Sequence, residues 1–175
     1  MNIILETERL ILREMKLSDA DALFEMDRNP NVHQYLWNKP ITDISEINAY
    51  IENVRKQYLD NRIGRFVVVL KETNELIGWA GLKYITEMVN NKINFYDIGY
   101  RLNEKFWGKG YASEASFAWI EYGFSKMNIE VIEAAAHKDN IASNIILQKI
   151  GLKKTDQLME DDISWHWYEL NNPNT

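Results

Sequence analysis

Two glycines that flank a single lysine form the spacing with the clearest chemical meaning in this 175-residue chain. Gly108, Lys109 and Gly110 lie between a predicted strand and a predicted helix at residues 112–126. Glycine lets the backbone bend tightly and approach a ligand closely. If the helix cap lies at Tyr111, no side chain satisfies the first backbone N–H groups. Those groups, the positive end of the helix dipole and the lysine then predict an anion site that suits a pyrophosphate.

Two other phosphate-binding motifs fit this segment less well. A P-loop needs four residues between its first glycine and a Gly-Lys pair, followed by Ser or Thr, and that spacing is absent. A dinucleotide fingerprint needs a third glycine where Ser113 stands, and no early strand–helix–strand unit surrounds the segment. Taken alone, the Gly-Lys-Gly turn is equally consistent with a tight turn that binds nothing.

Hydrophobic periodicity predicts the elements that position this segment. A helix is expected from Ser18, its N-cap, to about Arg28, and residues 29–40 are expected to form a loop. The apolar run at residues 66–70 predicts a strand buried on both faces. The order of elements predicts an α/β (α+β) fold with a mixed sheet. The expected strands are residues 10–13, 66–70, 76–82, 94–102, 131–136, 157–160 and 164–170, and the expected helices are residues 18–28, 43–60, 112–126 and 140–150.

Length and composition indicate one globular domain over residues 1–175, with 46% apolar and 26% charged residues. No apolar run reaches the roughly 20 residues that span a bilayer. The charged N-terminal segment is unlike a signal peptide, so we expect a cytoplasmic protein that does not act on membranes. The net charge of −6 argues against nucleic acid as a partner.

Cysteine and histidine usage narrows the chemistry further. The chain has no cysteine, which excludes disulfides, thiolate metal sites and a cysteine nucleophile. His33, His137 and His166 are far apart and show no metal-ligand spacing. We therefore expect no metal site.

Four stretches of the sequence, taken together, favour the interpretation of the glycine loop as a ligand-binding segment. They are Glu-Thr-Glu-Arg-Leu-Ile-Leu-Arg at residues 6–13, Asp-Ile-Gly-Tyr at 97–100, Phe-Trp-Gly-Lys-Gly-Tyr-Ala-Ser-Glu-Ala at 106–115, and Asn-Ile-Ala-Ser at 140–143 leading to Lys-Ile-Gly-Leu at 149–152. In this order they resemble the GNAT superfamily of acyl-CoA N-acyltransferases, and more closely its branch of ribosomal-protein N-terminal acetyltransferases. The resemblance implies a GNAT fold, with a mixed, mostly antiparallel sheet splayed between the fourth and fifth expected strands and helices on both faces.

The resemblance also implies acetyl-CoA as co-substrate, bound in the cleft between the splayed strands, and no metal. Main-chain groups of Tyr100, Arg101 and Leu102 would bind its pantetheine arm, and a backbone N–H near Tyr100 or Arg101 would serve as oxyanion donor. Asn140 is expected to hydrogen-bond the arm, to cap the helix that follows, or to do both. The residues implied for the pyrophosphate are Trp107, Gly108, Lys109, Gly110, Tyr111 and Ala112.

A base is needed to remove the proton of the amine in direct acyl transfer. We favour Asp97, which stands where this branch often has Glu before Ile-Gly-Tyr and which would act through a water. An exposed strand carboxylate without a catalytic role is equally consistent with the pattern. Glu169, His166 and His33 are weaker alternatives.

The acid that protonates the leaving thiolate departs from the family pattern. Many GNAT enzymes carry a tyrosine seven residues after the asparagine that corresponds to Asn140, and here that position is Leu147. The hydroxyl of Ser143 is the candidate acid in its place, although a serine in the first turn of a helix is common and solvent can also deliver the proton. No side chain suggests a covalent intermediate, so we expect direct transfer in a ternary complex.

The acceptor is expected to be a primary amine. His33, Tyr35 and Trp37 fall in a loop that borders the acceptor site in the family, so they are candidate substrate contacts, and a loop packed for its own sake is the alternative. The branch resemblance favours a protein N-terminal α-amine over a polyamine, an antibiotic or an amino-acid derivative. The rival functions are a non-catalytic acyl-CoA-binding or sensor domain and an unrelated nucleotide-phosphate binder. The oligomeric state is open, and edge pairing of the aromatic strand at residues 165–170 would give a homodimer.

Overall fold

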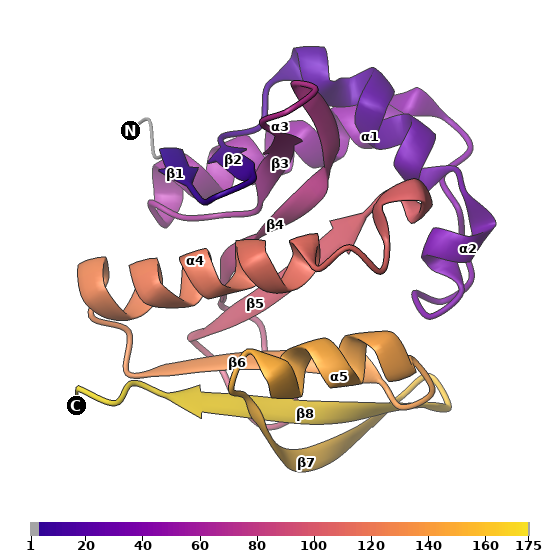
Figure 1. Ribbon diagram of the computed structural model, residues 1–175. Helices are drawn as coiled ribbons and strands as arrows, with labels where there is room; N and C mark the ends of the chain where they lie inside the picture. Colours follow the sequence, from indigo (N-terminus) through magenta and orange to yellow (C-terminus); the bar gives the residue numbers. More distant parts are fainter. Residues whose placement is uncertain (1–3, 175) are drawn as a thin grey trace.

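The structure, a computed structural model, describes residues 4–174 (Figure 1). One sheet runs through the described chain, with the strand order β1-β2-β3-β4-β5-β6-β8-β7. The strands are β1 (Ile4–Glu6), β2 (Leu10–Arg13), β3 (Phe66–Leu70), β4 (Glu75–Ile85), β5 (Phe95–Leu102), β6 (Val131–His137), β7 (Lys153–Glu160) and β8 (Ile163–Asn171). The helices are α1 (Ala20–Asp27), α2 (Pro30–His33), α3 (Ile44–Asp60), α4 (Tyr111–Lys126) and α5 (Ile141–Lys149), with short 3-10 turns η1 (Leu17–Asp19) and η2 (Glu104–Phe106).

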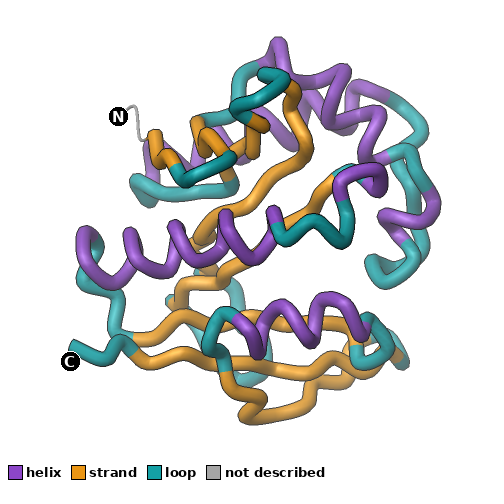
Figure 2. Tube along the Cα trace, viewed as in Figure 1, coloured by secondary structure: helices purple, strands orange, loops and turns teal. Residues whose placement is uncertain are grey.

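Helices cover both faces of the sheet, as Figure 2 shows with helices in purple and strands in orange. Apolar residues of α4 and α5 form one buried cluster with the sheet, and those of α1 and α3 form the other. In β3, Val68 belongs to the first cluster, whereas Val67 and Val69 belong to the second. Successive strand residues point to opposite faces. The apolar run therefore predicted a doubly buried strand correctly.

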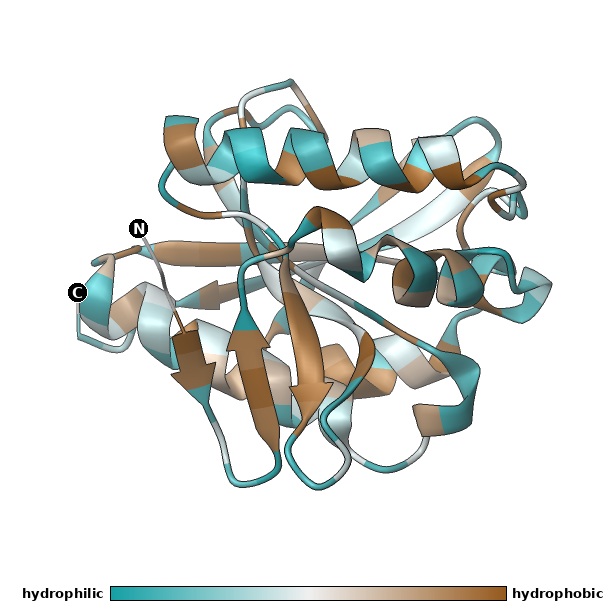
Figure 3. Cartoon of the chain, turned by 90° about the horizontal axis from the view of Figure 1, so that it is seen from above, coloured by the Kyte–Doolittle hydropathy of each residue, from teal (hydrophilic) through white to brown (hydrophobic). Residues whose placement is uncertain are grey.

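Hydropathy follows the same arrangement. In Figure 3 most strands are brown, whereas the helices alternate brown and teal along their length. Such alternation is expected of helices that bury one face and expose the other. Within residues 4–174, no helix is both long enough and apolar enough to cross a membrane.

The sheet splits between β5 and β6. These strands are parallel and pair only at Tyr96 with Ile132 and at Asp97 with Glu133. Beyond that point β5 stays paired with β4 and β6 stays paired with β8, so the two halves of the sheet diverge. These are the fourth and fifth strands expected from the sequence, and the predicted GNAT fold with its splayed sheet is confirmed.

Several local expectations were wrong. Ser18 does not cap the first helix, because it lies inside η1, where Asp19 accepts the backbone N–H of Lys16 at 2.8 Å. The expected loop at residues 29–40 contains α2, which Asn29 caps and whose first residue is a proline. No strand was predicted before residue 10, whereas the structure has the three-residue strand β1.

The expected edge pairing of residues 165–170 is also wrong. These residues belong to β8, which lies between β6 and β7 and is paired on both sides. The edge on that side is β7. The aromatic side chains of β8 therefore serve the interior and the cleft, and this strand offers no free edge to a second copy.

Candidate active site

A cleft of about 580 Å³ opens where β5 and β6 part, within the roughly 300–1,000 Å³ of small-molecule sites. Its walls come from β5, the glycine loop, the start of α4, the end of β6, α5, the α2 segment and one residue of β8. The predicted acid Ser143 and the predicted substrate contact Tyr35 lie in these walls. So do the predicted cofactor residues Tyr100, Arg101, Leu102, Trp107, Gly108, Gly110, Tyr111, Ala112 and Asn140.

The glycine loop has the conformation that only glycine adopts readily. Gly108 and Gly110 have φ angles of 72° and 82°, in the left-handed region. Gly110 is the N-cap of α4, and no side chain caps this helix. A Cβ atom at Gly108 would meet no atom within 4 Å, so open space lies beside the loop. The free N–H groups of the first turn and the positive helix end can thus receive an anion.

Arg9, in the turn between β1 and β2, contacts this loop. Its Nη1 donates to the carbonyl of Lys109 at 3.0 Å, and its guanidinium lies 4.4 Å from the ring centroid of Tyr111. It also forms an ion pair of 2.6 Å with Glu114 in the first turn of α4. The side chain of Lys109 lies over the ring of Phe106, and Lys109 does not line the cleft.

Glu114 is held as a carboxylate by its neighbours. Burial raises its pKa, but hydrogen bonds from the Thr7 hydroxyl and from the backbone and side chain of Arg9 outweigh burial and lower the pKa below its usual value. A negative charge at this end of α4 is also favoured by the helix dipole. The segment at residues 6–13 thus has a structural task, because Thr7 and Arg9 hold the start of α4 and the glycine loop in place.

The cofactor-side wall of the cleft carries two hydroxyl groups in contact. The phenol oxygen of Tyr100 on β5 lies 3.0 Å from Oγ of Ser143 on α5. Burial raises the pKa of Tyr100, so the phenol keeps its proton at neutral pH. Sequence reasoning noted the missing tyrosine at Leu147 but not that a phenol from β5 reaches the same helix. Each hydroxyl can donate a proton or a hydrogen bond to a ligand atom in this part of the cleft.

Two asparagines organise the α5 end of the cleft. Asn140 caps α5, with its Oδ1 accepting the backbone N–H of Ser143 at 3.1 Å. Asn144, which the sequence did not single out, donates to the carbonyls of His137 and Asn140 and accepts from the hydroxyl of Tyr168 at 2.6 Å. Asn140 therefore has the capping role expected of it, while its contact with a cofactor stays a prediction.

Asp97 lies at the last paired position before the strands part. Its side chain is on the opposite face of β5 from Tyr100, as the alternation along a strand requires. There the carboxylate pairs with Arg65, which also donates to the backbone carbonyl of Asp97 at 2.8 Å. Asp97 does not line the cleft. Its role as base stays a prediction.

His33 is not an exposed loop residue. It is 5% exposed, and its Nε2 lies 3.2 Å from Oδ1 of Asp27, which also accepts Nη1 of Arg101 at 2.7 Å. The side chains of Asp27, His33 and Arg101 thus link α1, α2 and β5 beneath the mouth of the cleft. His33 does not line the cleft, so its position does not support the predicted contact with an acceptor.

An aromatic cluster stands at the mouth of the cleft, on the face of the sheet that α1 and α2 cover. We call Tyr35, Trp37, His137 and Trp165 the mouth cluster. The ring centroids of Tyr35 and His137 are 5.3 Å apart, and those of Trp37 and Trp165 are 5.2 Å apart. Tyr35, His137 and Trp165 line the cleft, and Trp37 packs on Trp165 from outside. Sequence reasoning found the two loop residues but could not place His137 and Trp165 against them.

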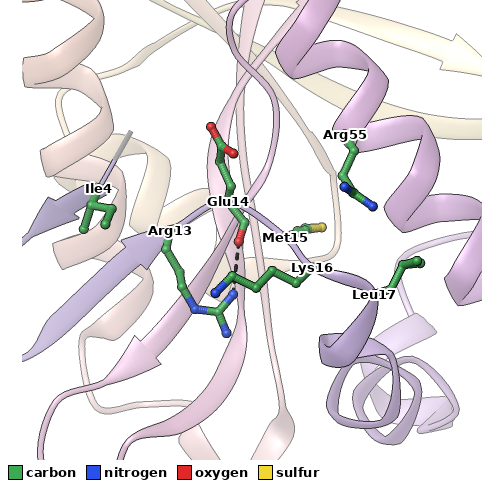
Figure 4. Close-up of a pocket in the computed structure, with 7 residues that line it drawn as sticks. All are labelled: Ile4, Arg13, Glu14, Met15, Lys16, Leu17 and Arg55. Atoms are coloured by element: carbon green, nitrogen blue, oxygen red, sulfur yellow. Dashed lines mark hydrogen bonds between the residues drawn. The ribbon is translucent and has the colours of Figure 1, made fainter. Parts of the chain in front are cut away.

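A second, smaller hollow lies at the other end of the molecule, between the start of the chain and α3 (Figure 4). Its two arginines already have partners, since Arg13 forms a double hydrogen bond with Asp19 and Arg55 pairs with Glu52. Within residues 4–174, no three His, Asp or Glu side chains gather in a way that could hold a metal ion. The main cleft is therefore the candidate active site.

The residues of this cleft fit an acyl-CoA. The uncapped start of α4 beside two left-handed glycines suits a pyrophosphate, and the free edge of β5 from Ile98 onward suits the amides of a pantetheine arm. A sheet that splays beside β5, with an anion site at the start of the helix that follows this strand, is typical of a class of acyl-CoA-binding proteins.

Comparison with known proteins identifies the family. The profile of the acetyltransferase (GNAT) domain matches residues 9–153. The uncharacterised N-acetyltransferase p20 of Bacillus licheniformis is 36% identical over 156 residues, which cover 89% of this chain and 85% of p20. Spermidine N(1)-acetyltransferase of Escherichia coli is 25% identical, over 86% of this chain and 76% of that protein.

A solved structure shows the same fold. The ribosomal L7/L12 α-N-protein acetyltransferase RimL, in complex with coenzyme A, superimposes with a TM-score of 0.82 at 20% identity, over 97% of this chain and 98% of that one. The chain thus belongs to the GNAT family of acyl-CoA-dependent N-acetyltransferases.

Proposed function

We propose that the cleft binds acetyl-CoA and that the enzyme transfers its acetyl group directly to an α-amine, with a protein N-terminus as acceptor. The observation that carries the proposal is the uncapped start of α4 beside Gly108 and Gly110, in the wall of a cleft between parted strands. The coenzyme A complex of RimL supports the choice of cofactor, and its L7/L12 substrate supports the choice of acceptor.

The chain's own groups have distinct tasks in this proposal. Bound acetyl-CoA supplies the acetyl thioester, whose C–S bond breaks as the C–N bond to the amine forms, giving an N-acetylamine and a free thiol. The backbone of residues 108–112 holds the pyrophosphate, and a backbone N–H near Tyr100 or Arg101 stabilises the carbonyl oxygen. The hydroxyl of Ser143, backed by Tyr100, delivers the proton to the sulfur. Asp97 receives the amine proton through water.

The ion pair with Arg65 affects how Asp97 could act as a base. The ion pair keeps the carboxylate at the junction of β5 and β6, close to where the strands open. To act as base, Asp97 must either give up its ion pair with Arg65 or receive the proton of the amine through a chain of water molecules. The amine can also lose its proton to solvent.

Two rival functions make different predictions. A polyamine acceptor is suggested by the spermidine relative, but no Asp or Glu is among the described residues that line the cleft. A non-catalytic sensor is suggested by Leu147, yet Tyr100 and Ser143 place hydroxyls in the cleft. We also propose a cytoplasmic location, which cell fractionation tests.

Calorimetric titration of the purified protein with acetyl-CoA, CoA, ATP and NAD tests the binding proposal. We expect selective binding of acetyl-CoA and CoA. Thiol release in the presence of peptides with free N-termini then tests transfer, with mass spectrometry to locate the acetyl group. Binding without release from any amine would establish the sensor, and binding of ATP or NAD alone would overturn the proposal.

A further inference from the structure

We propose that the mouth cluster selects an α-amine whose first side chain is apolar and uncharged, and that Trp165 and Arg101 hold the carbonyl oxygen next to that amine. This inference rests on the proposed function, because it assigns the acceptor of the same cleft. It names two parts of the acceptor: an apolar group beside the amine, and a hydrogen-bond acceptor one carbon away.

Charge is the first argument. No carboxylate is among the described lining residues, so a second cationic group of the acceptor finds no partner inside the cleft. Three carboxylates behind the walls are already paired: Asp27 with Arg101, Asp97 with Arg65, and Glu133 with Lys92 at 3.0 Å. Asp139, 4.0 Å from Nδ1 of His137, does not line the cleft and is largely exposed to solvent. Burying an unpaired charge is costly. Polyamines and N-termini with a basic first residue therefore bind poorly.

Unused hydrogen-bond donors are the second argument. The Nε1–H group of Trp165 is buried and has no partner among the described residues, while the ring lies in the cleft wall. Arg101 also lines the cleft and makes one side-chain hydrogen bond in the described structure, from Nη1 to Asp27. Buried donors in native proteins are almost always satisfied. A ligand oxygen in the cleft gives the Trp165 N–H its partner, and Arg101, whose side chain is 24% exposed, has further N–H donors for the same oxygen.

The shape and polarity of the mouth are the third argument. Tyr35, Trp37 and Trp165 present three aromatic rings, and the imidazole of His137 lies 5.7 Å from the ring of Trp165. Nδ1 of His137 accepts the backbone N–H of Asp139 at 3.1 Å, so this nitrogen is already engaged within the protein. Such walls favour an apolar or aromatic side chain over a carboxylate or a hydroxyl.

The backbone of the loop that carries Trp37 is the fourth argument. Trp37 and Asn38 have φ angles of 57° and 49°, and a bulky residue in this left-handed region is an outlier. Trp37 is also 52% exposed, despite its large apolar ring. Strained backbone of this kind concentrates at ligand-binding sites. The strain keeps an aromatic ring over Trp165, at the entrance to the cleft.

A matched series of acceptors tests the inference by thiol release at saturating acetyl-CoA. Five peptides share one lysine-free sequence and differ only in their first residue, which is Leu, Phe, Ser, Asp or Arg. Phenylalanine amide and 2-phenylethylamine form a second pair. They differ only by the carboxamide group, which carries the carbonyl oxygen. Spermidine is the polyamine probe. We expect kcat/KM for the Leu and Phe peptides to exceed that for the Asp and Arg peptides at least tenfold, and phenylalanine amide to exceed 2-phenylethylamine.

Variants separate the two parts of the acceptor. Trp37→Ala removes an exposed ring and should abolish the preference for Leu and Phe. Trp165→Phe keeps a six-membered aromatic ring and removes the five-membered ring with its unpartnered N–H, so the protein should fold while the advantage of phenylalanine amide over 2-phenylethylamine falls. Phe117→Ala is the control, because Phe117 is 47% exposed on α4 and does not line the cleft. It should leave both preferences unchanged.

The outcomes are distinct. Equal rates across the five peptides, or a faster reaction with spermidine, would overturn the inference and leave the acetyltransferase intact. An unchanged preference in folded Trp37→Ala and Trp165→Phe proteins would do the same. No thiol release from any amine would instead overturn the proposed function, and the inference with it.

Discussion

The two ends of the cleft are built in different ways. At the proposed cofactor end, main-chain groups of the glycine loop and β5 would face the ligand, and the conformation of the loop depends on Gly108 and Gly110. At the acceptor end, side chains from the α2 segment, β6 and β8 converge on one place. The first construction suits a cofactor that never changes, and the second suits an acceptor that differs between relatives. Substitutions should therefore affect affinity for CoA at one end and choice of amine at the other.

Gly110→Asp should give the largest effect and would confine it to the cofactor end. The new side chain is strained at φ of 82° and brings a negative charge to the proposed pyrophosphate. Two lost charge-assisted hydrogen bonds weaken binding by about 1,000-fold, or ~4 kcal/mol. Calorimetry measures the affinity. Gly151→Asp is the matched control, because it adds the same charge at φ of 98° outside the cleft. Unchanged CoA affinity in folded Gly110→Asp protein would refute the phosphate site.

Asp97→Asn should lower turnover at the junction of the two ends without weakening CoA binding. Loss of a general base costs about 100-fold in kcat. The pH profile of kcat separates this role from a structural one, because removal of a base should steepen the dependence on external pH and buffer. Asp97→Glu should recover part of the activity. Equal turnover of Asp97→Asn and the parent across neutral pH would exclude Asp97 as base.

Ser143→Ala and Tyr100→Phe should each lower kcat about tenfold, since a thiolate with a thiol pKa of about 8.5 leaves readily even without a proton. Both changes should leave the choice of amine unchanged, because these hydroxyls lie on the cofactor side of β5. Thiol-release kinetics with two peptides measure both quantities. A shift in peptide preference would show that the two ends are not independent.

Glu114→Gln should give the smallest effect, on stability and not on selectivity. The folded pKa of Glu114 lies below its usual value of 4.5. Its carboxylate therefore stabilises the fold above the unfolded pKa, and this contribution is lost as pH falls through the folded pKa. We expect a loss of about 1 kcal/mol at pH 7 that disappears once the pH is below the folded pKa, measured by urea unfolding at several pH values. A loss that is constant with pH would contradict the ion pair with Arg9.

The difference between the ends also explains what the sequence could predict. The glycine loop is a local signal, because left-handed backbone and an uncapped helix restrict the residues at a few adjacent positions. The splayed strands followed from the family resemblance, and the doubly buried β3 followed from an unbroken apolar run. The capping role of Asn140 was equally local, since a cap and its partner lie three residues apart.

The acceptor end could not be predicted in the same way. Trp37 and Trp165 are in contact only because the sheet brings β8 beneath the α2 segment. The local sequence around either residue does not predict this contact. The burial of His33 depends on Asp27 and Arg101, and Arg101 is 74 positions away from Asp27. Arg65 pairs with Asp97 across the sheet in a similar way. Contacts of this range follow from topology, and a single sequence shows only the residue types.

The free edge of β5 links folding to ligand supply. From Ile98 onward, no strand among the described residues pairs with that edge, so a bound pantetheine arm would take the place of a missing neighbour. A ligand that binds only the folded chain adds about 2.7 kcal/mol to stability at a concentration of 100 Kd. For a domain of this size, that raises the melting temperature by roughly 5–10 °C. The cell's pool of acetyl-CoA would then set how long each copy of the protein survives thermal unfolding and proteolysis.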